Sequence, residues 1–160
     1  MTVLYTPGQL RSAVSIAPET YRHWKKAVAS LDRGRGHSPC FSSGDMVAAS
    51  VIRALAIDLS VRVGALAPIA KTLFELCNRS PWPVLERTKV VLNLQEADVR
   101  LAEELAEAHS DQPLIIIPLR AIVGHLREQL LAATDHVEQR SLLFPPIPIA
   151  SAATAQRGRP

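Results

Sequence analysis

The sequence predicts a mainly α-helical fold with a small α+β part toward its C-terminus. Three observations predict it: two short segments start with Pro at a first-turn position, apolar residues recur with helical spacing between 47 and 77, and two β-rich runs follow only after residue 83. Pro81-Trp82-Pro83 marks the change in character. We therefore expect three regions: an N-terminal helical domain over 1–80, an α+β part over 84–140 and a flexible Pro-rich tail over 144–160.

Composition bounds the class of protein before any motif is considered. The 160 residues are 48% hydrophobic and 21% charged, which is typical of a soluble globular protein. No apolar run approaches the roughly 18–20 residues that a membrane helix needs, so we expect a cytoplasmic protein without membrane contact. Cys40 and Cys77 lie outside any C-x-x-C spacing, and we expect buried or half-buried thiols, no metal site and no cofactor.

Positive charge is concentrated in the first quarter of the chain. Residues 1–43 carry six basic and two acidic groups, a net charge of +4, whereas the other 117 residues have a net charge of −1. Such asymmetry suggests that a module facing a polyanion is joined to a neutral one.

Two short helices are predicted at the N-terminus. Thr6-Pro7-Gly8-Gln9 has the pattern of a capping box with Pro in the first turn, and this helix should end at about Val14. Ser15-Ile16-Ala17 interrupts the pattern, and Pro18 starts the second helix. Two short helices joined by a turn of three to four residues form a helix-turn-helix arrangement, whose second helix can enter a DNA major groove.

The second helix divides into two faces. Tyr21, Trp24 and Val28 fall at i, i+3 and i+7 and form an apolar stripe, while Arg22, His23 and Lys26 project on the other side. A loop or small hairpin then follows, in which Arg33, Arg35 and His37 alternate. In an extended strand all three would share one side, which suggests phosphate contact; a flexible connector is the alternative.

Further elements follow in order. Ser42-Ser43-Gly44-Asp45 predicts another capped helix, and the next helix carries an apolar stripe that ends at Cys77, which we expect to pack in the core. Strands are predicted at 89–94 and 114–117. Between them, 96–109 is predicted as a helix because Ala, Glu and Leu dominate it, with a hairpin strand at Val99-Arg100-Leu101 as the alternative. A final helix is predicted from Pro118 to Ala133.

The order of these elements resembles the DNA-binding domain of MerR-type transcription regulators. The resemblance covers about half of the chain: the opening Tyr5-Thr6-Pro7-Gly8-Gln9-Leu10, the run Glu19-Thr20-Tyr21-Arg22-His23-Trp24, and Ser43-Gly44-Asp45-Met46-Val47 at the third helix. It implies a winged helix-turn-helix dimer on an operator, with Arg22 and His23 in DNA-contacting positions and Trp24 in a packing position. The chain departs from the family at Ser15, where Gly is usual, and lacks the long heptad stretch after Leu76.

Sequence-specific binding of double-stranded DNA by a homodimeric transcription regulator is therefore the predicted function. The expected contacts are basic or polar side chains of the N-terminal region: Arg22, His23, Lys26, Thr20, Lys25, Arg11, Arg33, Arg35 and His37. An excisionase-like factor that bends DNA is one alternative, and a protein-binding adaptor or anti-activator is another. No nucleophile or Gly-rich phosphate motif is present, so we do not expect an enzyme. A protein partner or a small-molecule effector remains unidentified.

Overall fold

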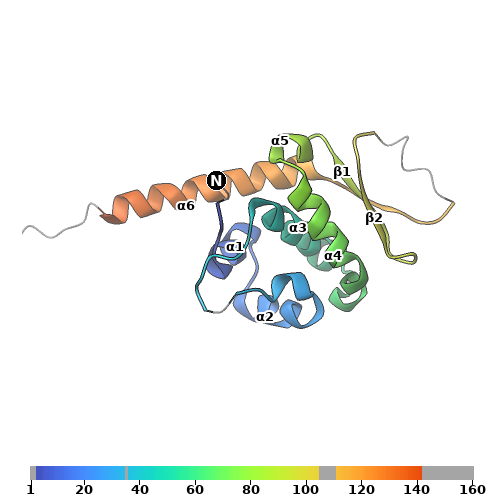
Figure 1. Cartoon of the computed structure of the whole chain (residues 1–160), viewed down its shortest axis with the longest axis horizontal. Helices are drawn as coiled ribbons and strands as arrows, with labels where there is room; N and C mark the ends of the chain where they lie inside the picture. The colour runs from blue at the N-terminus through green and yellow to red at the C-terminus, as the bar shows by residue number, and fades with distance from the viewer. Residues whose placement is uncertain (1–2, 35, 105–110, 142–160) are drawn as a thin grey trace, which may run out of the picture.

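The computed structural model describes residues 3–34, 36–104 and 111–141, and it is mainly α-helical with one small sheet (Figure 1). This confirms the predicted fold class at that level. The helices are α1 (Pro7–Val14), α2 (Pro18–Ala27), α3 (Ser43–Arg53), α4 (Val63–Arg79), α5 (Trp82–Leu85) and α6 (Leu119–Ser141). A 3₁₀ turn, η1 (Ala29–Leu31), follows α2, and a π-helical turn, η2 (Ala54–Asp58), continues α3.

Local capping explains where α1 begins and ends. The Thr6 hydroxyl accepts a hydrogen bond from the Gln9 backbone N–H (3.1 Å), and the Gln9 side chain accepts one from the Thr6 N–H (2.8 Å). At the other end Ser15 takes a left-handed conformation, with φ of 58°, which lets the chain turn sharply into α2. The predicted capping box and both predicted helix starts are therefore confirmed.

The α3 helix begins with the second predicted capping box. The Ser42 hydroxyl accepts a hydrogen bond from the Asp45 N–H (3.1 Å), and the Asp45 carboxylate accepts one from the Ser42 N–H (2.8 Å). Cys77 is fully buried on α4, as predicted, and Cys40 is half-buried.

The sheet has three antiparallel strands in the order β2-β1-β3. They are β1 (Lys89–Asn93), β2 (Asp98–Ala102) and β3 (Ile115–Pro118), and the central residue Val91 lies opposite Arg100 on one side and Ile116 on the other. The strands predicted at 89–94 and 114–117 are confirmed. The final helix runs on past the predicted end at Ala133 and extends beyond the rest of the molecule (Figure 1).

The helix favoured for 96–109 was wrong where the structure describes this segment, because 98–102 is a strand; residues 105–110 lie outside the described chain. The Asn93 side chain causes the reversal: its amide oxygen accepts hydrogen bonds from the N–H groups of Gln95 (3.0 Å) and Glu96 (3.2 Å). This Asx turn, followed by Ala97 with φ of 53°, directs the chain back along β1. Strand pairing then overrides the helix propensity of the segment.

One hydrophobic core joins residues from both sides of Pro81-Trp82-Pro83. It includes Leu10 and Trp24 from the first helices together with Leu92 from the sheet and Leu126 from α6. The α4 helix contacts both α3 and β2, while α6 packs on α1, α3 and α5. The Trp82 indole N–H also donates to the Ser43 carbonyl oxygen (3.1 Å), linking the predicted boundary to the start of α3.

Within the described parts of the chain, no helix combines the length and hydropathy needed to span a bilayer. The predicted tail at 144–160 lies outside the described residues.

Candidate nucleic-acid interface

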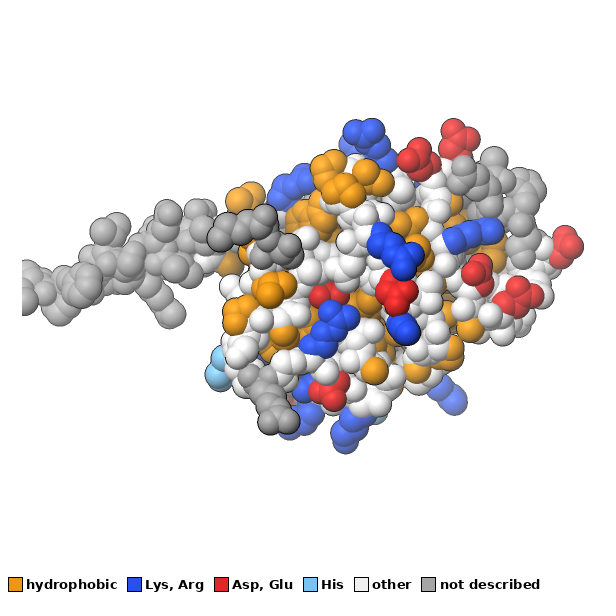
Figure 2. Space-filling model, in the orientation of Figure 1, with side chains coloured by type: hydrophobic (Ala, Val, Ile, Leu, Met, Phe, Trp, Pro, Cys, Tyr) orange, Lys and Arg blue, Asp and Glu red, His pale blue; other side chains and the backbone are white. Residues whose placement is uncertain are grey.

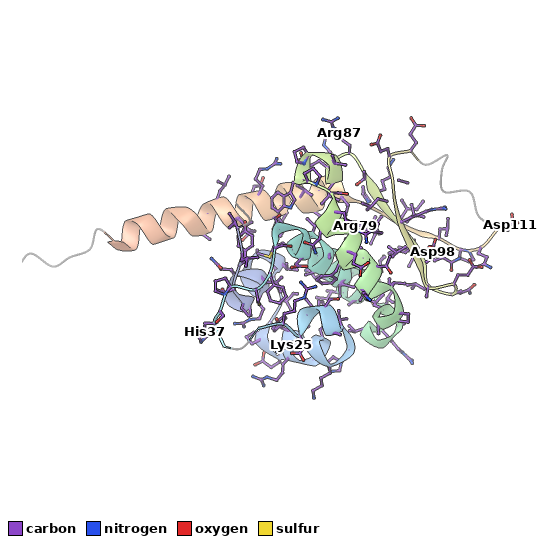
Figure 3. The ribbon with its side chains drawn as sticks, in the orientation of Figure 1. Lys25, His37, Arg79, Arg87, Asp98 and Asp111 are labelled. Carbon is purple, nitrogen blue, oxygen red and sulfur yellow. The ribbon has the colours of Figure 1, made fainter. Side chains whose placement is uncertain are left out.

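Four cationic side chains and one histidine line a single shallow hollow of about 270 Å³ beside α2. We call it the basic concavity; its basic side chains are Arg11, Arg22, Lys25, Arg33 and His37. Figure 3 shows Lys25 on α2 and His37 on the turn that follows, both at the lower edge of the molecule, and Figure 2 shows other Lys and Arg side chains there. The structure therefore brings five of the nine predicted contact residues together.

Helix geometry places the first three of these side chains. Arg11 lies in the last turn of α1, and Arg22 and Lys25 lie three residues apart on α2, so they share one face of that helix. Lys25 forms an ion pair with Asp32 (3.0 Å) and sits 5.9 Å from the Tyr21 ring centroid. In the described chain no carboxylate forms an ion pair with Arg11 or Arg22, so their charges are available to an outside anion.

The remaining side chains of the basic concavity come from a tight turn and not from the extended strand that alternation suggested. Gly34 and Gly36 have φ of 71° and 69°, so alternate residues do not share one side. A Cβ at Gly34 would also lie 2.9 Å from Cys40 Sγ, so a larger residue there would have to displace the Cys40 side chain. Arg33 and His37 nevertheless line the same hollow, whereas Arg35 lies outside the described residues.

Backbone pairing fixes the far end of this turn. Tyr5 N–H donates to the Phe41 carbonyl (2.7 Å) and Phe41 N–H donates to the Tyr5 carbonyl (3.1 Å), forming an isolated antiparallel bridge. Cys40 N–H also donates to the Tyr5 carbonyl (2.9 Å). The segment that precedes α1 therefore holds the segment that follows the turn.

Arg33 has a structural partner that the sequence reasoning missed. Its Nη1 donates to Asp45 Oδ2 (3.1 Å), and its guanidinium lies 5.7 Å from the Phe74 ring centroid. Asp45 is only 1% exposed and also accepts from Asn78 Nδ2 (2.8 Å). Arg33 thus anchors the turn to α3 and α4 while it lines the basic concavity. The capping pattern in the sequence predicts that Asp45 accepts a backbone hydrogen bond at the start of α3. No sequence pattern predicts its ion pair with Arg33, which lies twelve residues earlier.

The outer face of α2 carries three further predicted residues. His23 and Lys26 are exposed beside Arg22 but do not line the basic concavity, and Thr20 is half-buried. Tyr21 and Trp24 are buried on the opposite face, as predicted. The helix therefore packs on one side and presents basic groups on the other.

Burial governs the titration of the aromatic side chain behind these cations. Burial raises the pKa of Tyr21 to about 12; nearby Cys40 and Asp32 act in the same direction, while Arg11 opposes them. Burial also raises the pKa of Cys77 to about 12 and that of Cys40 above its usual value. All three groups therefore stay neutral at physiological pH.

Stability is expected to fall as the pH rises from about 9 to 12. In the unfolded chain these thiols and Tyr21 lose their protons near their usual pKa values, whereas in the folded state they ionise only at higher pH, so deprotonation favours unfolding. Urea titrations at pH 8, 10 and 11.5 measure the loss. Tyr21→Phe should be about 1 kcal/mol less stable at pH 8, because it loses the hydrogen bond to the Leu31 carbonyl, and should lose less stability between pH 10 and 11.5. If the wild type and Tyr21→Phe lost the same stability between pH 10 and 11.5, ionisation of Tyr21 would not contribute to the pH dependence.

No group of three or more His, Cys, Asp or Glu side chains able to hold a metal ion occurs in the described residues. A second group of basic residues, Arg87, Lys89 and Arg120, borders a hollow of about 540 Å³ near α5 and the start of β1, and Arg87 is labelled in Figure 3.

Comparisons with protein-family models, with curated proteins and with solved structures found no match.

Proposed function

We propose that this protein binds double-stranded DNA through α2 and the basic concavity, and that it acts as a transcription regulator. The observation that supports the proposal most is the convergence of Arg11, Arg22 and Lys25 with the anchored turn, because it places cations from three segments on one surface. The neighbouring exposed side chains of His23 and Lys26 widen this surface along α2. Such a surface suits the phosphate backbone of a nucleic acid, which is a polyanion.

The order of elements supports a winged helix-turn-helix arrangement. The sharp turn at Ser15 separates α1 from α2. The glycine turn, which contains Gly34 and Gly36, follows α2 at the point in the chain where a wing would contact the DNA backbone. In this arrangement Arg22, His23 and Lys26 face base edges in the major groove, and Arg11, Lys25 and His37 face phosphates. Arg33 contributes by holding the turn in place.

Selection of bound DNA from a random pool tests the function directly. A palindromic consensus would support sequence reading by a homodimer, since two-fold symmetric dimers impose their half-site spacing on the DNA. Binding to every sequence alike would contradict a sequence-specific regulator. Failure to retain DNA even at 50 mM salt would contradict DNA binding altogether and favour the adaptor alternative, because counterion release makes such binding strongest at low salt.

Arg22→Ala is expected to weaken binding to the selected DNA by about 1–3 kcal/mol, measured by fluorescence anisotropy at fixed salt. The side chain is exposed, so the melting temperature should hardly change. Arg100→Ala is the matched control, because it removes another exposed arginine, from β2 and outside the basic concavity. If both variants lost the same affinity, general charge and not the α2 surface would account for binding.

A further inference from the structure

A second hollow, of about 390 Å³, lies between the end of α1, the α3–η2 junction and α6. We call it the Arg53 pocket; it is lined by Val14, Ser15, Arg53, Asp58, Ile122 and His125, among others. Its size falls in the range of small-molecule sites, and its walls mix apolar side chains with a few polar groups, as such sites do. It is separate from the basic concavity in the residues that line it.

Arg53 has one buried donor that nothing in the described chain satisfies. Its Nη1 donates to the two Asp58 carboxylate oxygens (3.1 and 3.4 Å), whereas Nε is buried from solvent and has no hydrogen-bond partner among the described residues. Burying a donor without an acceptor is unfavourable, and such groups are uncommon in folded proteins. The Nε–Nη2 edge of the guanidinium is therefore left for an acceptor from outside.

The π-helical turn creates this arrangement. In an α-helix, residues five apart point about 140° away from each other, so Asp58 could not face Arg53. The wider turn of η2, closed by the Leu59 N–H to the Ala54 carbonyl (3.0 Å), brings residues five apart onto one face. It fixes one edge of the guanidinium against Asp58 and leaves the other edge unused, and π-helical turns often occur at functional sites.

Charge balance selects the kind of anion. Asp58 already offsets the charge of Arg53, and His125 is the other titratable group that lines the pocket. A dianion such as phosphate would lie close to the Asp58 carboxylate with only one guanidinium to balance both. A monocarboxylate instead matches the planar Nε–Nη2 edge, and its apolar body would contact Val14 and Ile122.

We propose that the Arg53 pocket binds a small organic monocarboxylate with an apolar body, held by the Nε–Nη2 edge of Arg53. Because Nε is buried in the ligand-free protein, binding requires a small rotation of the Arg53 side chain about its Nη1–Asp58 pair, and the side chain is one-third exposed (33%), which leaves room for that rotation. The proposal is independent of DNA binding, because none of these residues belongs to the basic concavity.

Titration of the ¹⁵N-labelled full-length protein with benzoate tests the proposal. The backbone amide signals of Ser15, Ala54 and Ala121 should shift and saturate. Benzyl alcohol, which has the same ring without the charge, should bind about tenfold more weakly or worse, and so should inorganic phosphate. Equal binding of benzyl alcohol or of phosphate, or benzoate shifts spread over the whole surface, would overturn the proposal.

Three variants identify the residues responsible. Arg53→Lys keeps the charge but lacks the planar edge, and it should weaken benzoate binding about tenfold. Asp58→Asn should strengthen it severalfold, because the guanidinium then has no competing carboxylate. Ala121→Phe fills the pocket from α6 and leaves residue 53 as arginine, so it should abolish binding and keeps the test decisive if an Arg53 variant folds poorly. Benzoate binding unchanged in Ala121→Phe would place the ligand elsewhere and overturn the proposal.

Discussion

Replacing Asp45 with alanine is expected to lower the free energy of unfolding by about 3 kcal/mol. The carboxylate is 1% exposed and accepts three hydrogen bonds from different parts of the chain: from Ser42 N–H (2.8 Å), Asn78 Nδ2 (2.8 Å) and Arg33 Nη1 (3.1 Å). Alanine would end all three at once, removing half of the α3 cap and the anchor of the glycine turn. Chemical denaturation followed by circular dichroism measures the effect.

Two milder substitutions separate the roles of Asp45. Asp45→Asn keeps the shape but removes the charge that attracts Arg33, so an intermediate loss is expected. Ser42→Ala removes the capping hydroxyl, which also donates to Asn78 Oδ1, and should cost about 1–2 kcal/mol. If Asp45→Ala were no worse than Ser42→Ala, the buried network would contribute nothing beyond the helix cap.

Gly44→Ala is expected to destabilise the protein by a similar amount, about 3 kcal/mol. A Cβ at this position would lie 2.7 Å from both the Asn78 Cα and the Cys77 carbonyl oxygen. Both atoms belong to the α4 backbone, which cannot rotate away as a flexible side chain can. The helices α3 and α4 would therefore have to separate, opening the core between them.

Gly124→Ala provides the matched control in α6. Nothing lies within 4 Å of a Cβ built there, so the same added methyl group meets open space. It should stabilise the protein by about 0.5–1 kcal/mol, because alanine restricts the unfolded chain and favours helix. Thermal unfolding of the two variants side by side gives the comparison, and a loss of stability in both would refute the close-contact explanation for Gly44.

Local signals made most of the helical part predictable. The two capping boxes at Thr6 and Ser42, and the prolines at the starts of α1 and α2, act within one turn of the chain, so the sequence alone reveals them. For 98–102 the favoured helix was wrong and the alternative, a hairpin strand at Val99-Arg100-Leu101, is confirmed. The composition of this segment favours helix, whereas the strand depends on pairing with β1 and on the Asn93 side chain.

The candidate sites were less predictable because they depend on distant contacts. Charge and spacing in the sequence were enough to predict each basic residue of the basic concavity as a contact residue. That these residues lie together depends on the angle between α1 and α2 and on the turn anchored by Asp45, which the sequence does not reveal. The Arg53 pocket depends on the π-helical turn, for which the sequence has no clear signature. Its lining comes from segments more than 60 residues apart, which only the folded chain brings together.

Because they share the core described above, we expect the two halves of the chain to unfold together. Leu126 of α6 and Leu92 of β1 belong to the same cluster as Leu10 and Trp24, which support the basic surface of α1 and α2. A substitution that destabilises the sheet or α6 is therefore expected to destabilise α2 as well, even though it lies outside the proposed DNA-binding surface. A loss-of-function variant that maps to the C-terminal half would not by itself reveal a separate activity there.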